Sequence, residues 1–561
     1  MNDLVLHPGL VLIVGALLLP FLRGTPRSVA IVALPLLVLG LVWQVPDGAV
    51  WQLRFLDHTI TPLQGDKLSR LFATIFAIMA VGGGLFALGQ KSRLEVPAAF
   101  VYAGSAIGVA LAGDLITVFA FWELMAVGST LVLWSQGSEA SYRAARRYAM
   151  VHLLGGVILF AGVTGHVVQT SSVAFTHMEA NSIAHWLILI GFLINAGAPP
   201  LSAWLPDAYP EASWSGTVFL SAFTTKTAVY VLIRGFAGTE LLIWVGLFMV
   251  FYGIVYALLE NDMRRILAYS IVNQVGFMIA GIGIGTEMAL NGAAAHAFTH
   301  IIYKALLLMS AGSVLMMTGR RKCSELGGLF HTMPLTTVCG TIGALAISSF
   351  PLTSGFVSKS MVSQSAADGH LLFVWLALTA ASAGVFLHAG IKFPWFVFFQ
   401  KDSGLRPAEP PATMRWAMVF FAFLCIAIGV WAEPLYALLP YATTYEPYTW
   451  AHVLAQLQLL LFSGLAFFVM LPFLKRTLTI TLDTDWLWRR VGPALYALVQ
   501  KPYAAIRRLL GRELDSTGRA AGALVLRHYG QDGRLARTWS TRSMALWVLV
   551  LLIGYLLLYY I

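Results

Sequence analysis

Long apolar runs recur along the chain, each about twenty residues long and separated by short polar segments. The run LITVFAFWELMAVGSTLVLW is typical. Runs of this length cross a bilayer as helices, whereas strands of a membrane barrel would be about half as long and would alternate. The pattern predicts an all-α polytopic membrane protein with about 16 transmembrane helices, centred near Ile13, Leu37, Ile78, Ile107, Glu123, Gly156, Leu193, Val229, Phe251, Met278, Leu306, Ser348, Phe386, Ala422, Leu461 and Tyr555.

Composition supports a membrane protein and excludes a soluble domain of this size. The 561 residues are 58% hydrophobic and 11% charged, more apolar surface than a single soluble core needs. The first apolar run is preceded by Asp3 and by no basic residue, so we expect a first transmembrane helix rather than a cleaved signal peptide. Cys323, Cys339 and Cys425 are scattered, without the spacing of a metal or disulfide site. We therefore expect no cofactor, no metal and no catalytic residue, and any redox chemistry in another chain.

Basic residues concentrate in alternate loops. The positive-inside rule then makes the loops after odd-numbered spans cytoplasmic and puts both termini on the outer side of a prokaryotic cell membrane. One loop, 206–216, is predicted to be cytoplasmic yet carries Asp207 and Glu211. The basic residues are Arg23, Arg27, Lys91, Arg93, Arg143, Arg146, Arg147, Arg264, Arg265, Arg320, Arg321, Lys322, Lys401 and Arg406.

The segment 475–542 differs from the rest of the chain. It holds 13 Lys and Arg against 5 Asp and Glu, with apolar residues at helical spacing. This pattern predicts an amphipathic helix on the cytoplasmic membrane surface, attracted by anionic lipid; the alternative is a solvated linker. A last transmembrane helix is expected over 543–561.

Two apolar spans are interrupted by similar sequences. PLSAWLPDA begins at Pro200 and PLTSGFVSK at Pro351, five spans later. Proline breaks helical hydrogen bonding, and paired broken helices indicate inverted repeats around an ion path; two unrelated kinks are the alternative. We predict three spans in 1–95, a first five-helix repeat in 96–237, an inverted second repeat in 238–397 and two further spans in 398–474. The broken-helix positions are Asn195, Pro199, Pro200 and Pro351.

Ionisable residues stand near the middle of four apolar spans. A charge at the bilayer centre costs about 2.5–3.5 kcal/mol on insertion scales, so such residues face a protein interior. Three of them are four residues apart and share one helical face. Imidazole titrates near neutrality, so the row favours a proton relay, although a lone buried histidine is more often a packing residue. The candidate path residues are Glu123, Lys226, His296, His300, Lys304 and Lys359.

Six motifs together resemble one family. In chain order they are FWELMAVGS, PPLSAWLPDAYPEA, TKTAVYVLIRG, NDMRRILAYS, HAFTHIIYKALLLMSAGSV and FPLTSGFVSK, within residues 60–400. They resemble the antiporter-like membrane subunits of respiratory complex I, membrane-bound hydrogenases and Mrp-type Na+/H+ antiporters. LDTDWLWRR and the basic stretch after it resemble the D-type Mrp subunit.

The resemblance implies two inverted five-helix bundles joined by a polar axis. Glu123, Lys226, His300, Lys304 and Lys359 match the family's charged positions. The sequence departs at Asn195, where the family has a lysine that pairs with the glutamate, and at Ser202, where it has a histidine. Water and Asn195 could relay protons there, another cation such as Lys226 or His152 could serve Glu123, or this half could be inactive.

The resulting hypothesis is a proton-translocating subunit of a multisubunit cation/proton antiporter. The alternatives are an antiporter-like subunit of a redox-driven pump and a non-conducting scaffold subunit. The expected partners are other membrane subunits, the lipid bilayer and protons, with Na+ as an open candidate, and no nucleic acid.

Overall fold

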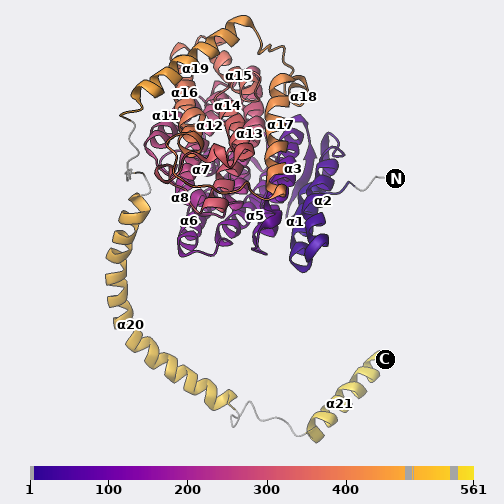
Figure 1. Ribbon diagram of the computed structural model, residues 1–561. Helices are drawn as coiled ribbons and strands as arrows, with labels where there is room; N and C mark the ends of the chain where they lie inside the picture. The colour runs from indigo at the N-terminus through magenta and orange to yellow at the C-terminus, as the bar shows by residue number, and fades with distance from the viewer. Residues whose placement is uncertain (1–4, 474–482, 484–485, 531–540, 561) are drawn as a thin grey trace. The chain divides into compact units, whose positions relative to one another are not determined.

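The computed structural model describes residues 5–473, 483, 486–530 and 541–560 (Figure 1). The chain divides into two units, 1–485 and 486–561. In the second unit, α20 (Gly492–Tyr529) follows a π-helical turn at Leu487–Val491, and α21 (Thr541–Tyr560) is the last helix. The basic segment predicted over 475–542 is thus helical over most of its length, while 475–482, 484–485 and 531–540 lie outside the described residues.

The first unit begins with two helices, a β-hairpin and a third helix. They are α1 (Pro8–Leu18), α2 (Gly24–Val42), β1 (Gly48–Phe55), β2 (His58–Gly65) and α3 (Lys67–Phe86). The antiparallel hairpin departs from the all-α prediction. Its physical reason is local: in WQLRF apolar and polar residues alternate, the period of a strand with one packed face.

The region predicted as the first repeat forms seven helical pieces. They are α4 (Glu95–Ala110), α5 (Leu115–Trp134), α6 (Glu139–Thr170), α7 (Ile183–Ala196), α8 (Trp204–Ala208), α9 (Gly216–Leu220) and α10 (Thr224–Phe236). Side chains of Asp114, Ser138 and Ser182 cap α5, α6 and α7. After α7 the chain leaves the helix through Gly197, whose φ of 79° is left-handed and favours glycine.

The region predicted as the second repeat contains another interrupted helix. Its elements are α11 (Leu241–Leu259), α12 (Met263–Ile284), α13 (Glu287–Thr318), α14 (Pro334–Ile347), α15 (Phe356–Asp368) and α16 (Leu372–Val385). Pro351 lies between α14 and α15, where Ser349 and Leu352 have positive φ. Beyond α16 the helix continues as two π-helical segments, η6 (Phe386–Lys392) and η7 (Trp395–Phe399).

Three further helices complete the first unit: α17 (Ala412–Val430), α18 (Glu433–Ala437) and α19 (Trp450–Met470). Although far from it in sequence, α17 lies beside α3 (Figure 1). A Cβ on Gly82 of α3 would stand 2.0 Å from the ring of Phe421, so glycine at this position lets the two helices approach. Short 3-10 turns occur at Leu19–Phe21, Ala87–Gly89, Tyr209–Glu211, Cys323–Glu325 and Leu329–His331.

The protein is a multi-pass membrane protein. Twelve helices among the described residues are long and apolar enough to cross a bilayer, and four shorter apolar helices accompany them. Every predicted span centre falls in a helix except Ser348, which lies at the end of α14; the exact count of 16 stays a prediction. Except for Arg234, Arg265 and Ile284, every residue of Gly216–Phe236 and Met263–Ile284 is buried, so the buried polar side chains on these segments face an interior rather than lipid.

Candidate functional site

Five predicted path residues meet in the interior between α10, α13 and α15. The side chains of Lys226, His296, His300 and Lys304 are 0% exposed, and that of Lys359 is 2% exposed. We call these five residues the central axis. Buried ionisable groups in a membrane protein mark a functional path by default, because each has to be compensated inside the protein.

Lys226 lies next to a break between two helices, α9 and α10, that the sequence did not reveal. Residues 221–223 separate α9 from α10, which frees backbone carbonyls. The Lys226 ammonium donates hydrogen bonds to the carbonyl oxygen of Ser221 at 2.7 Å and to Thr225 Oγ1 at 3.1 Å. The broken helix thus supplies an acceptor that an unbroken helix would keep for itself.

On α13, His296, His300 and Lys304 follow one another along one face, as their spacing predicts. His296 lies 3.1 Å from Gln274 Oε1 and 3.4 Å from Ser358 Oγ, and Lys304 donates to Ser270 Oγ at 2.8 Å. His300 lies between these two residues on the helix, and neither of its ring nitrogens has a hydrogen-bond partner among the described residues. Neutral polar groups of α12 therefore solvate the two ends of the row.

Lys359 lies on α15, just past the interruption at Pro351. Within the described part of the chain its ammonium has no hydrogen-bond partner, and it stands 5.1 Å from the centre of the Phe277 ring. A cation over an aromatic face is weakly stabilised. Its neighbour in sequence, Ser358, touches His296, which joins α15 to the row on α13.

The axis residues are close enough for their charges to interact. Lys226 interacts electrostatically with Lys304, His300 interacts with both lysines, and His296 with Lys359. Among the described residues, none of the five forms an ion pair. Since like charges in a protein interior repel and no carboxylate among the described residues pairs with them, adding a proton at one site disfavours a charge at the next.

His388 is a buried residue of this region that the sequence analysis missed. It lies on η6, 0% exposed, with Nδ1 2.8 Å from the carbonyl oxygen of Gly384, and its electrostatic neighbours are Lys304, Lys359 and Lys392. The pattern HAGIK, with a histidine and a lysine four residues apart inside an apolar run, is the signal that could have found it. Lys392 caps α11 by donating to the carbonyl oxygens of Ala257, Leu258 and Glu260.

Glu123 of α5 and Asn195 of α7 both pack against α6. The Glu123 carboxylate is half-buried and packs on Gly156, where an added Cβ would stand 2.0 Å from Oε1; this oxygen has no hydrogen-bond partner in the described residues. Asn195, near the end of α7, contacts His152 of α6, with 2.8 Å between Asn195 Oδ1 and His152 Nδ1. Pro199 and Pro200 lie in the loop that follows α7.

The acidic residues of loop 206–216 form ion pairs with arginines that are distant in sequence. Asp207 accepts two hydrogen bonds from Arg147 at 2.7 and 3.0 Å, and Glu211 pairs with Arg321 at 3.1 Å. Asp262 caps the start of α12 by accepting from the backbone N–H groups of Arg264 and Arg265. These charges therefore serve structure at the helix ends, outside the central axis.

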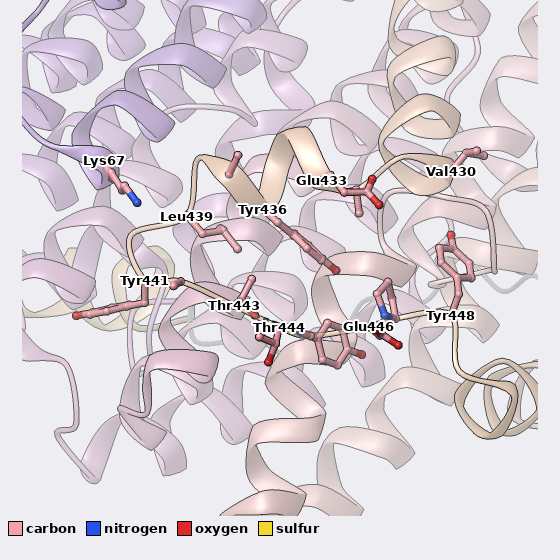
Figure 2. A pocket seen from close by; sticks show the side chains of 15 residues that line it. Lys67, Val430, Glu433, Tyr436, Leu439, Tyr441, Thr443, Thr444, Glu446 and Tyr448 are labelled. Carbon is pink, nitrogen blue, oxygen red and sulfur yellow. Dashed lines mark hydrogen bonds between the residues drawn. The ribbon is translucent and has the colours of Figure 1, made fainter.

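A hollow of about 830 Å³ is lined largely by α18 and the loop that follows it (Figure 2). Tyr436 from α18 reaches into it, and its hydroxyl donates to the carbonyl oxygen of Val357 at 2.6 Å, two residues before Lys359. The lining residues are Lys67, Val430, Ala432, Glu433, Tyr436, Ala437, Leu439, Tyr441, Ala442, Thr443, Thr444, Tyr445, Glu446, Pro447 and Tyr448. The described residues contain no group of three or more side chains that could hold a metal ion.

Interrupted helices and buried ionisable groups are typical of membrane proteins that move ions. Residues 112–384 match the family described as NADH:quinone oxidoreductase/Mrp antiporter, transmembrane. Residues 112–384 belong to this family of antiporter-like membrane proteins.

Relatives and a solved structure agree with this assignment. The A/B component of a probable K(+)/H(+) antiporter of Rhizobium meliloti is 29% identical over 66% of this chain and 40% of its own length. The D component of the Na(+)/H(+) antiporter of Alkalihalophilus pseudofirmus is 27% identical over 78% of this chain and 95% of its own length. One protein of the Mrp complex of a Dietzia species has the same fold, with a TM-score of 0.69, 22% identity, and coverage of 81% of this chain and 99% of that chain.

Proposed function

We propose that this chain is a proton-translocating subunit of a multisubunit cation/proton antiporter. Protons would move along Glu123, Lys226, His296, His300, Lys304 and Lys359. The observation that carries the proposal is the central axis, a set of five buried basic groups contributed by three helices. Membership of the antiporter-like family supports the same conclusion.

The mechanism follows from charge repulsion in a medium of low dielectric. Because the axis contains several basic groups and no carboxylate, only some of them hold a proton at one time. A proton arriving at Lys226 favours release of a proton from Lys304 or His300, and the released proton passes along α13 to Lys359. The neutral acceptors Ser221, Ser270 and Gln274 hold the side chains while their charges change.

The surroundings proposed for the chain are a cell membrane and a complex with other membrane subunits. The related D component of a Na(+)/H(+) antiporter and the Mrp complex support this assembly. We propose that both termini lie on the outer side, as the loop charges predict. The exchanged cation would be Na+ or K+, the ions in the names of the two relatives.

Substitution of the two ends of the axis tests the function. Lys226→Ala and Lys359→Ala are expected to lower the proton flux by at least ~10-fold, the lower end of what a proton-transfer group contributes. The flux is measured as the recovery of acridine orange fluorescence when NaCl or KCl is added to inside-out vesicles that contain the chain with its native partners. The exposed Lys91→Ala is the control. Wild-type flux in both axis variants, at normal levels of assembled complex, would overturn the proposal and favour a scaffold.

A further inference from the structure

His152 occupies, in the first predicted repeat, the place that His300 occupies in the second. α6 and α13 are the third helices of the two predicted repeats, both have 32 residues and both begin with a glutamate. His152 and His300 are the fourteenth residues of these helices. One turn earlier the two helices carry Tyr148 and His296, and one turn later Gly156 and Lys304.

The His152 ring is fixed on several sides. Its centre is 4.0 Å from that of Tyr148 and 4.7 Å from that of Trp204. Trp204 is itself anchored, since its indole N–H donates to the carbonyl oxygen of Ile194 at 3.0 Å, beside Asn195. Trp204, at the start of α8 just past the interruption after α7, therefore holds the ring in one orientation.

The hydrogen bond to Asn195 defines which ring nitrogen is basic. Asn195 Oδ1 can only accept, so His152 Nδ1, at 2.8 Å, carries the hydrogen. Nε2 is then the nitrogen that can take up a proton. It is buried without a hydrogen-bond partner in the described part of the chain, as is Glu123 Oε1. The Glu123 carboxylate rests on Gly156, one turn from His152 on the same helix, and i,i+4 positions are neighbours on a helix face.

Hydroxyl groups continue from His152 toward Lys226. The hydroxyl of Tyr148 donates to Ser129 Oγ at 3.0 Å and lies 3.4 Å from Thr224 Oγ1. Thr224 is two residues before Lys226, and Lys226 bonds the next hydroxyl, that of Thr225. Polar groups thus line the space between α6 and the first residue of the central axis.

We infer that His152 is the proton-relay residue of the first half of the protein and takes the place of the lysine that the resemblance expects at Asn195. A proton leaves the Glu123 carboxyl group, which becomes a carboxylate, and binds His152 Nε2, which becomes an imidazolium. Asn195 Oδ1 and the carboxylate stabilise this cation. Release of the same proton toward Lys226 restores the neutral ring. The inference rests on the proposed function.

The direct test is His152→Asn, measured as salt-induced proton flux in the same inside-out vesicles. The asparagine amide keeps a donor near the Nδ1 position but cannot take up a proton. The proton flux is expected to fall by at least ~10-fold. His166→Asn on the same helix is the matched control, because His166 also hydrogen-bonds a neighbour, His185, at 3.0 Å; its flux should stay at the wild-type value.

A rescue experiment separates a relay from a packing role. Adding Asn195→Lys to His152→Asn restores a titratable group beside Glu123, so the flux should return to at least roughly a third of wild type. A lost packing contact would not be repaired by a lysine on another helix. A double variant as slow as the single variant would overturn the inference.

The outcomes for this inference and for the proposed function are distinguishable. If Lys226→Ala blocks proton flux while His152→Asn leaves it intact, the inference fails and the function stands. If both retain wild-type flux, both fail. If His152→Asn lowers the amount of assembled complex, His152→Gln replaces it as a second side chain that cannot titrate. The same loss of proton flux is expected. Failure of both variants to assemble would identify His152 as a packing residue and overturn the inference.

Discussion

The carboxylate of Asp66 joins α3 to α10. Oδ1 accepts a hydrogen bond from the backbone N–H of Ser69 at 2.7 Å and so caps α3, while Oδ2 accepts from Arg234 Nη2 at 2.6 Å. Burial alone raises the pKa of Asp66, but the Arg234 guanidinium and the Ser69 amide outweigh it and hold the pKa below its usual value. The helix that follows the hairpin is thereby fixed to the helix that carries Lys226.

Asp66→Asn should keep the cap and lose the ion pair. Because the Asp66 side chain is 36% exposed, solvent screening limits the expected destabilisation to about 1 kcal/mol. Asp47→Asn is the control. Asp47 pairs with Arg70 but its side chain is 76% exposed, so losing this pair should change the stability less. Thermal unfolding followed by size-exclusion chromatography measures both.

The same pair predicts a pH dependence. Since the folded-state pKa is lowered, the stabilisation is present above the ordinary carboxyl pKa and is lost as the pH falls through the folded value. The difference in melting temperature between wild type and Asp66→Asn should therefore shrink toward zero on acidification. A difference that stays constant below the ordinary carboxyl range would show that the ion pair is not its source.

Gly156→Ala should impair transport without unfolding the protein. The new methyl group would stand 2.0 Å from Glu123 Oε1, and the flexible carboxylate end moves more readily than backbone. We expect Glu123 to be displaced and the proton flux to fall about 3- to 10-fold. Gly40→Ala, where nothing lies within 4 Å of the new Cβ, is the control. Normal flux in Gly156→Ala would argue that the position of Glu123 does not matter.

Lys392 is expected to contribute to stability rather than to proton movement. Its ammonium donates to three carbonyl oxygens at the end of α11, at 2.6 to 3.0 Å. Lys392→Met removes these bonds, and a loss of about 3 kcal/mol is expected from hydrogen bonds to a charged group. Lys91→Met on the surface is the control. An unchanged melting temperature combined with lost proton flux would instead make Lys392 a path residue.

Hydrophobic patterning predicted the helices because it depends on each segment alone. The spacing of His296, His300 and Lys304 likewise predicted one face of α13, since four residues make about one helical turn. The interruption at 221–223 was missed because SAF contains neither proline nor glycine. Only the packing of the neighbouring helices and the Lys226 bond to Ser221 account for it.

The partners of the buried groups could not be predicted, because they belong to other helices. Gln274 and Ser270 of α12 face the row on α13 through the packing of the two helices, which no spacing within one segment encodes. His152 could be named as a candidate cation from its sequence, yet its contact with Asn195 depends on how α6 and α7 meet. The π-helical winding that places His388 also lacks a local sequence signature.

The hairpin has a consequence for association between molecules. β1 pairs with β2 in a two-stranded sheet, so the opposite edge of β1 is a template for a strand of another molecule. The exposed Leu53 and Phe55 would favour such an association. The pairing register shifts twice along β1, between Ala49 and Trp51 and between Trp51 and Leu53. These irregularities twist the strand and misalign its free amides, so an incoming chain meets no regular ladder and aggregation through this edge is discouraged.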